Sequence, residues 1–281
     1  MIRVVLNADD LGLAPALTRR VLDLRARGLV SDVSLLAAGR AAREAMETLR
    51  AGEAAQAGVH LCLVGRERPL APPASVPSLL SGGVFRAHWS GVAAALAAGR
   101  IRVTEVEREW EAQVAHVAEA GIAVTHLDSH QHLHLHPKLF PVAVRIAQRF
   151  RVPFLRAPLA DDLEAADVPF PARARARLLG FLGGRGRSLL ERAGLPGPPR
   201  VLGLAEAGRM SSERLARLLG GLSGGDYEVV LHPGEEDDVT RTTYRWGFRW
   251  SEEADALSSP AVAAAARAAG IAIVGFAALS P

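Results

Sequence analysis

The stretch IAVTHLDSHQHLHLHP, residues 122–137, joins a short apolar run to a cluster of histidines. The run over 122–127 follows Gly121 and has the length and composition of a buried parallel strand. Five of the chain's nine histidines lie between positions 126 and 136. Side chains that follow a parallel strand lie at the carboxyl edge of the sheet, where α/β proteins bind ligands. The stretch therefore predicts a strand that ends in a functional site.

Six other apolar runs share these features. Together, the expected strands are residues 2–8, 33–38, 58–64, 122–127, 152–157, 228–232 and 271–276. Helical patterns separate them, and two of these patterns begin at Pro15 and Pro260, since proline suits the first helical turn. This alternation predicts an α/β fold with a parallel sheet. About seven strands favour an irregular (β/α) barrel over a regular eightfold one.

We expect a single domain over residues 1–281, which is long enough for one large core. Two stretches interrupt the alternation, and both are interpreted as loop insertions. Residues 66–90 are rich in Pro, Ser and Gly, and residues 158–200 carry repeated arginines. Four glycines within 180–186 disfavour a continuous helix in the second insertion.

The composition excludes several classes of protein. The chain is 49% hydrophobic with a net charge of +3, and it lacks the aromatic-rich basic strip typical of nucleic-acid binding. Cys62 is the only cysteine, so no intrachain disulfide can form. The N-terminal residues resemble a strand rather than a signal peptide, and no run of 18 uncharged apolar residues occurs. We expect a cytoplasmic protein that binds no nucleic acid.

Polar side chains recur at the ends of five expected strands. They are Asn7, Asp9 and Asp10; His60; His126, Asp128 and His130; Arg156; and His232. Taken singly, such an Asp is more often a helix cap and such a His a satisfied core residue. Capping does not readily explain five strands that end this way at one edge, so the pattern favours a site.

One carboxylate and two imidazoles are typical ligands of a catalytic zinc, although other divalent ions, Mg²⁺ included, use nitrogen and oxygen ligands too. A neighbouring carboxylate that does not bind the metal can take a proton from metal-bound water. The residues alone do not decide which two histidines would bind the metal. His126 and His130 are four apart and could pair on a helix, whereas His60 and His130 would join two strands.

Five motifs occur in order along nearly the whole chain. They are NADDLGL (7–13), GVHLCL (58–63), THLDSHQHLHLHP (125–137), HPG (232–234) and RWSEEADALSSPAV (249–262). On these motifs the chain resembles the YdjC-like carbohydrate deacetylases, which implies an irregular (β/α) barrel similar to that of polysaccharide deacetylases. Leu11 and Leu231 depart from the family pattern, but neither is a ligand position.

The resemblance also implies roles for individual residues. It makes Asp10, His60 and His130 the metal ligands, Asp9 the catalytic base, His232 the general acid and Arg156 the residue that orients the base. His126, His132 and His134 are expected to contact substrate or to orient the ligands.

The implied reaction is hydrolysis of the N-acetyl group of an amino sugar with one divalent ion, Zn²⁺ or Mg²⁺. The alternatives are hydrolysis of another amide or ester, and a sugar-binding protein that holds metal without turnover. Residues 65–80 and 200–219 resemble the hopanoid-associated branch, which favours an N-acetylglucosaminyl lipid over an oligosaccharide. Besides the sugar, the expected partners are a second copy of the chain and, through the arginine- and leucine-bearing residues 171–200, a membrane surface.

Overall fold

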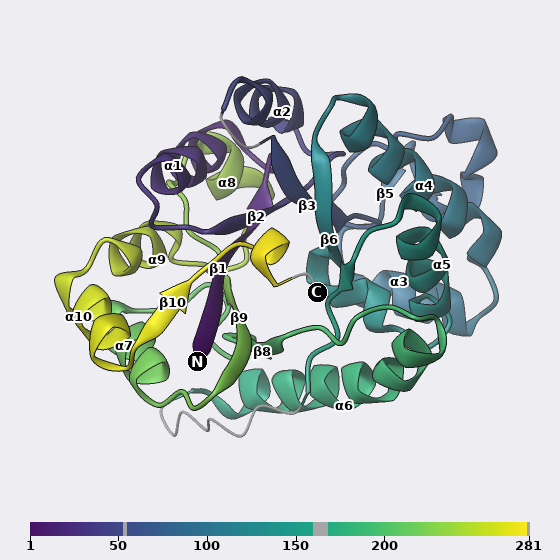
Figure 1. Ribbon diagram of the computed structural model, residues 1–281. Coiled ribbons are helices and arrows are strands. Elements are labelled where there is room, and N and C mark those ends of the chain that lie inside the picture. The colour runs from purple at the N-terminus through teal and green to yellow at the C-terminus, as the bar shows by residue number, and fades with distance from the viewer. Residues whose placement is uncertain (53–54, 160–167, 280–281) are drawn as a thin grey trace.

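The computed structural model describes residues 1–52, 55–159 and 168–279 (Figure 1). Its main sheet contains parallel strands only. They are β1 (Ile2–Leu11), β2 (Asp32–Leu35), β3 (Gln56–Leu61), β6 (Ala123–Ser129), β7 (Phe154–Leu155), β8 (Arg200–Leu202), β9 (Gly225–Leu231) and β10 (Ile271–Ile273).

The helices surround this curled sheet (Figure 1). They are α1 (Pro15–Ala26), α2 (Ala42–Ala51), α3 (Trp89–Ala97), α4 (Val103–Glu119), α5 (Phe140–Phe150), α6 (Phe170–Arg192), α7 (Ser212–Gly220), α8 (Asp238–Thr243), α9 (Trp250–Leu257) and α10 (Pro260–Ala268). Short 3-10 turns cover Pro73–Ser75, Pro77–Leu79, His130–Leu135 and Phe276–Ala278. One apolar cluster runs from Val4 in β1 to Val262 in α10 and forms the main core.

The sheet is a curled half-barrel of seven strands in the order β7-β6-β3-β2-β1-β9-β8. The eighth strand, β10, shares one edge of β1 with β2, because it pairs with Ile2–Val4 while β2 pairs from Asn7 onward. Within the described ranges, β7 and β8 at the two ends of the order do not pair. The expected irregular α/β barrel is confirmed, and its open side explains the irregularity.

All seven expected strands are present, and β8 is the one strand of the main sheet that the sequence did not indicate. It comprises three residues at the end of the expected second insertion and pairs only with β9. A strand this short has no detectable periodicity, so its pairing partner reveals it and its own residues do not.

The expected loop over 66–90 contains only short turns and a small hairpin of β4 (Leu80–Ser81) and β5 (Val84–Phe85) before α3 begins. The expected loop over 158–200 is wrong for most of its length, because α6 is one continuous helix of 23 residues. Residues 160–167 of that insertion lie outside the described ranges.

Two of the glycines explain why α6 forms despite its composition. A Cβ added to Gly183 would lie 2.1 Å from the carbonyl oxygen of Pro158, and one added to Gly186 would lie 2.6 Å from the ring of Phe140. The glycines therefore let the helix backbone approach the barrel closely. The packing gained by this approach offsets their low helix propensity.

Candidate metal centre and active site

The end of β1 places two adjacent carboxylates in the site. Asp9 and Asp10 are both buried, and the register between β1 and β2 shifts between Ala8 and Leu11. Asp10 has a φ of +64°, a left-handed conformation that non-glycine residues seldom adopt. Neighbouring side chains of a regular strand point to opposite faces, so this irregularity allows both carboxylates to serve one site. Backbone strain of this kind typically persists at functional positions.

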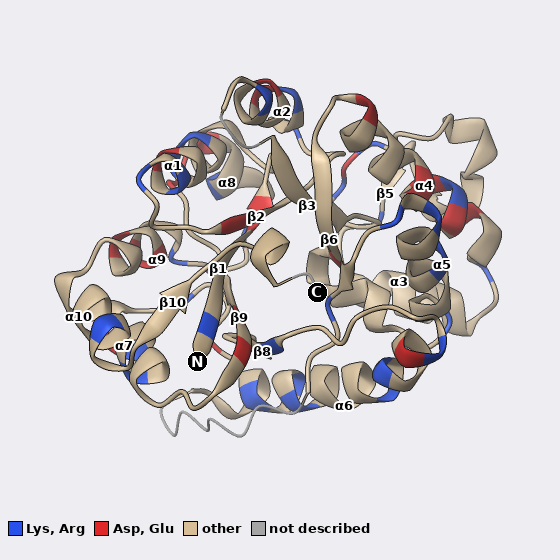
Figure 2. Cartoon of the chain, viewed as in Figure 1, with Lys and Arg blue, Asp and Glu red and all other residues tan. Residues whose placement is uncertain are grey.

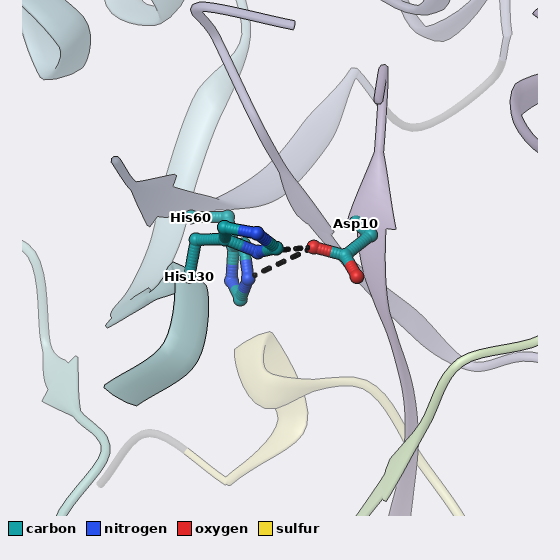
Figure 3. Close-up of side chains that lie close together, drawn as sticks. All are labelled: Asp10, His60 and His130. Carbon is teal, nitrogen blue, oxygen red and sulfur yellow. Dashed lines mark hydrogen bonds and ion pairs between the residues drawn. The ribbon is translucent and has the colours of Figure 1, made fainter. Parts of the chain in front are cut away.

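Asp10 joins the two histidines that the family resemblance implied as ligands (Figure 3). Its Oδ1 lies 2.8 Å from Nδ1 of His130 and 3.3 Å from Nε2 of His60. One ligand atom of each residue lies within 4.8 Å of the others. The fold therefore brings together three side chains from β1, β3 and the turn after β6.

The electrostatics of this group fit a cation. Although burial raises the pKa of Asp10, His130 and His60 hold it well below its usual value. Burial lowers the pKa of His60, but Asp128 and Asp9 raise it well above the usual value. The acidic side chains thus favour a positive charge at His60. A divalent ion would supply that charge and displace the proton.

Nδ1 of His130 is the ring nitrogen that faces Asp10, whereas its Nε2 is buried without a hydrogen-bond partner among the residues that the structure describes. A second group, Asp9, His60 and Asp128, also has ligand atoms within 4.8 Å of one another. Arg156 already pairs with both carboxylates of that group, so the set of Asp10, His60 and His130 fits a metal better.

The sequence places Asp128 at a strand end without predicting a role for it, and the structure gives it a central position in the site. Its Oδ1 lies 2.9 Å from Nδ1 of His60, and its Oδ2 accepts a hydrogen bond of 2.9 Å from Ser34. His60 and Asp128 are paired in register across β3 and β6, so the sheet itself aligns them. Metal-binding histidines commonly pair their second ring nitrogen with a carboxylate. The sequence feature that could have identified Asp128 is its position in the motif, two residues from His126 and two from His130.

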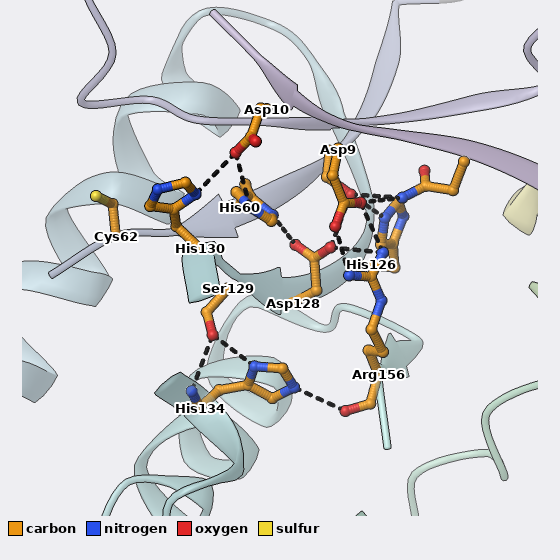
Figure 4. Close-up of polar contacts among 12 residues, drawn as sticks. Asp9, Asp10, His60, Cys62, His126, Asp128, Ser129, His130, His134 and Arg156 are labelled. Carbon is orange, nitrogen blue, oxygen red and sulfur yellow. Dashed lines mark hydrogen bonds and ion pairs between the residues drawn. The ribbon is translucent and has the colours of Figure 1, made fainter. Parts of the chain in front are cut away.

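Arg156 follows β7, and its buried guanidinium contacts Asp9 and Asp128 (Figure 4). Its Nη1 lies 2.7 Å from Oδ2 of Asp9, and its Nη2 lies 2.8 Å from Oδ1 of Asp9. Nε also donates to Glu228 at 3.0 Å, and burial raises the pKa of Glu228 to about 7 although Arg156 lowers it. Asn7 donates a further hydrogen bond of 2.8 Å to Asp9. The carboxylate of Asp9 is therefore held in one orientation.

His232 follows β9, and its backbone N–H donates to Oε2 of Glu253 at 2.5 Å. Its ring meets the ring of Phe248 edge to face at 5.0 Å. Nδ1 is buried, and the described part of the chain offers it no partner. Burial lowers the pKa of His232, while Asp10 and Asp9 oppose this shift. A lower pKa makes the imidazolium form a better proton donor.

His126 lies in β6 and takes part in the hydrogen-bond network, and it is not a member of the group of Asp10, His60 and His130. Its Nε2 lies 2.9 Å from Oγ of Ser34, and its ring stacks on Phe276 at 4.0 Å. Gly58 leaves room for the ring, because a Cβ there would lie 2.2 Å from it. The alternative of a helical pair between His126 and His130 is wrong, since the first residue is in a strand.

The other two histidines of the run differ from each other. His134 contacts Oγ of Ser129 at 2.6 Å through Nδ1 and the carbonyl oxygen of Arg156 at 2.9 Å through Nε2. Burial lowers the pKa of His134 to about 4, so the neutral ring supports the backbone that carries Arg156. His132 has a φ of +55°, and burial and Arg156 lower its pKa well below the usual value. A substrate contact for either ring stays a prediction.

Aromatic side chains between 244 and 250 lie beside the site. The ring of Trp246 lies 5.1 Å from that of His130 and 5.6 Å from that of Phe248, which contacts His232. Trp246 also lines a cavity of about 530 Å³, together with Arg40, Arg66, His88 and Tyr244 among others. The candidate ligand His130 and the candidate acid His232 therefore border one aromatic surface.

Known proteins are similar to this chain in sequence and in fold. The family model described as YdjC-like protein matches residues 3–268. The carbohydrate deacetylase of Mus musculus is 34% identical over 244 residues, which cover 83% of this chain and 78% of that one. The human carbohydrate deacetylase is 33% identical over 243 residues, covering 83% and 75%.

A crystal structure from Enterococcus faecalis V583, of a protein described as a candidate for cellobiose-phosphate cleavage, has a TM-score of 0.78. It is 24% identical and covers 99% of both chains, so it shows that the fold is shared. The family match spans nearly the entire sequence, and it includes every residue of the group described above. The chain therefore belongs to the YdjC-like protein family.

Proposed function

We propose that this protein is a metal-dependent carbohydrate deacetylase that releases acetate from an N-acetylated amino sugar. The observation that carries the proposal is the convergence of Asp10, His60 and His130 beside the held carboxylate of Asp9. The mouse and human relatives named carbohydrate deacetylase support the substrate class.

Asp10, His60 and His130 would hold the metal. A divalent ion there would act as a Lewis acid and make a bound water a nucleophile near neutral pH. Two imidazoles and one carboxylate suit Zn²⁺, whereas Mg²⁺ prefers oxygen ligands, so both ions belong in the assay.

Asp9 is proposed as the base that accepts the proton of the attacking water. Arg156 and Asn7 keep its carboxylate in place, which reduces the reorganisation that the proton transfer requires. His232 is proposed as the acid that protonates the leaving amine. It follows a different strand, and its pKa is lowered by burial.

The cavity lined by Trp246 is the proposed position of the sugar. About 530 Å³ accommodates a sugar unit, and an aromatic face beside polar side chains is suited to an amphipathic ring. An N-acetylglucosamine-containing oligosaccharide and an N-acetylglucosaminyl glycolipid, such as a hopanoid, are the substrates to compare. The cytoplasmic location and the homodimer remain predictions.

The test combines metal content with acetate release from diacetylchitobiose and from an N-acetylglucosaminyl hopanoid. Asp9→Asn should keep the metal and lose about 10²–10⁴-fold in kcat, as general bases typically contribute. His60→Ala should lose the metal itself. Bound metal without acetate from any N-acetylated sugar would reject the deacetylase and favour another hydrolase or a binding protein.

Further variants test individual roles. Metal retained in His130→Ala but lost in His126→Ala would overturn the proposed ligand set. His232→Ala should lose least rate with substrates whose leaving amine needs little protonation. An equal loss for all leaving groups would count against the acid role.

A further inference from the structure

The inward face of α6 combines small residues with leucines. Ala176, Gly180, Gly183, Gly186 and Leu190 are buried there, and Leu179, Leu182 and Leu189 pack against the core. Three large apolar side chains, Phe170, Leu178 and Phe181, are exposed instead. Helical geometry places the buried and the outward sets on opposite sides of the helix. The helix therefore buries three of its four glycines and exposes both of its phenylalanines, so packing on the barrel does not account for the outward residues.

The outward face forms a continuous stripe. Phe170 is 71% exposed, Leu178 is 54% exposed and Phe181 is 60% exposed, and the exposed Ala174 lies between the first two. These are three of the eight large hydrophobic side chains that are exposed within the described ranges. Scattered apolar residues are ordinary on a surface, but a stripe on one helix face marks an interaction site.

The second half of the same face is basic. Arg185 and Arg192 continue the stripe at helical spacing, and the guanidinium of Arg185 lies 5.8 Å from the ring centre of Phe181. Figure 2 shows arginines along the whole of α6. The helix sequence contains six arginines and only one acid, Glu191. The stripe thus combines exposed aromatic and aliphatic side chains with positive charge.

We propose that this stripe of α6 docks the protein on an anionic lipid bilayer as a peripheral contact. Helices that lie in the membrane interface insert phenylalanine and leucine between headgroups, while arginine attracts anionic lipid. No helix within the described residues is long and apolar enough to cross a membrane, which agrees with a surface contact.

The proposed contact also has a connection to the active site. The inward face of α6 packs against the turn His130–Leu135, which begins at the candidate ligand His130. A protein bound through the outward face would therefore keep the site close to the lipid surface. The proposal does not depend on the chemistry of the site, because binding is measured without substrate.

The test is sedimentation of the purified protein with vesicles at low salt. One set contains phosphatidylcholine and phosphatidylglycerol, and the other contains phosphatidylcholine alone. We expect pelleting with the anionic vesicles and about a tenfold weaker partition for the triple variant Phe170→Ser, Leu178→Ser and Phe181→Ser. Trp89→Ser is the matched control, because Trp89 is also exposed, at 51%, but lies on α3. It should bind as the wild type does.

Arg185→Glu with Arg192→Glu should lose binding to the anionic vesicles as the triple variant does, and added salt should weaken the wild type. No pelleting of the wild type with the anionic vesicles would overturn the proposal, and so would equal pelleting of the triple variant. Light scattering tests whether a second copy of the chain binds the stripe instead of a membrane. A dimeric wild type whose triple variant is monomeric would show that the stripe binds a second copy, and the membrane proposal would then be wrong.

Discussion

Arg156 donates two parallel hydrogen bonds to the carboxylate of Asp9, although the two residues are 147 positions apart in the chain. The two distances are 2.7 and 2.8 Å, and both side chains are almost completely buried. The same guanidinium contacts Asp128 and Glu228. Three strands thus converge on one cation, and the position of the proposed base depends on it.

Removing this cation should destabilise the fold strongly. Arg156→Gln leaves Asp9, Asp128 and Glu228 without their buried partner, so the free energy of unfolding should fall by about 3–5 kcal/mol. Urea unfolding of the metal-free protein measures it. The control is Arg145→Gln, since Arg145 pairs with Glu107 at the surface and should cost at most about 1 kcal/mol. Equal losses in the two variants would contradict the central role of Arg156.

Asp128→Asn should weaken metal binding without removing a proposed ligand. The carboxylate orients His60 through Nδ1, and the loss of such a partner typically lowers metal affinity about 10–100-fold. Metal titration of the purified variant tests this. Asp226→Asn is the control, because Asp226 pairs with Arg3 away from the site. An unchanged metal affinity in Asp128→Asn would mean either that His60 does not bind the metal or that Asp128 does not orient His60.

The glycines of α6 should respond to alanine in opposite directions. At Gly186 a Cβ would meet the ring of Phe140, so Gly186→Ala should cost about 1–3 kcal/mol through overpacking. At Gly184 only a leucine side chain lies near, at 3.7 Å, so Gly184→Ala should gain up to about 1 kcal/mol from helix propensity. Thermal unfolding compares them. Stabilisation by both would show that α6 does not pack as closely as described.

Glu253 should make stability depend on pH. Burial raises its pKa to about 7 in the folded state, although backbone N–H groups donate to it. Its ordinary value, expected in the unfolded chain, is about 4.3. The stabilisation is complete below the unfolded value. It is lost as the pH rises from there through the folded value, by up to about 4 kcal/mol.

Glu253→Gln cannot ionise and should therefore lack this loss. Urea unfolding from about pH 5 to about pH 8 should show the wild type losing stability relative to this variant. Glu252→Gln is the matched control, because it removes the same charge from the next, partly exposed position. Parallel pH profiles for wild type and Glu253→Gln would reject a raised pKa.

The sequence by itself determined the features that depend on local patterns. Short apolar runs and their polar ends indicated the seven strands and the edge at which Asp10, His60 and His130 meet. Hydrophobic periodicity and strand polarity are properties of neighbouring residues, so they can be read without the fold. The family motifs favoured His60 over His126 as the expected ligand, which spacing could not do.

Only the tertiary structure decided the contacts between distant segments. It made Asp128 the support of His60, placed His126 against Ser34, and revealed β8 through its pairing with β9. It also showed α6 as a continuous helix. Pro158 and Phe140 leave no room for a Cβ at Gly183 and Gly186, so the need for glycine there comes from distant residues. Register across a sheet and close approach between backbones depend on residues far apart in the chain, and no local pattern records them.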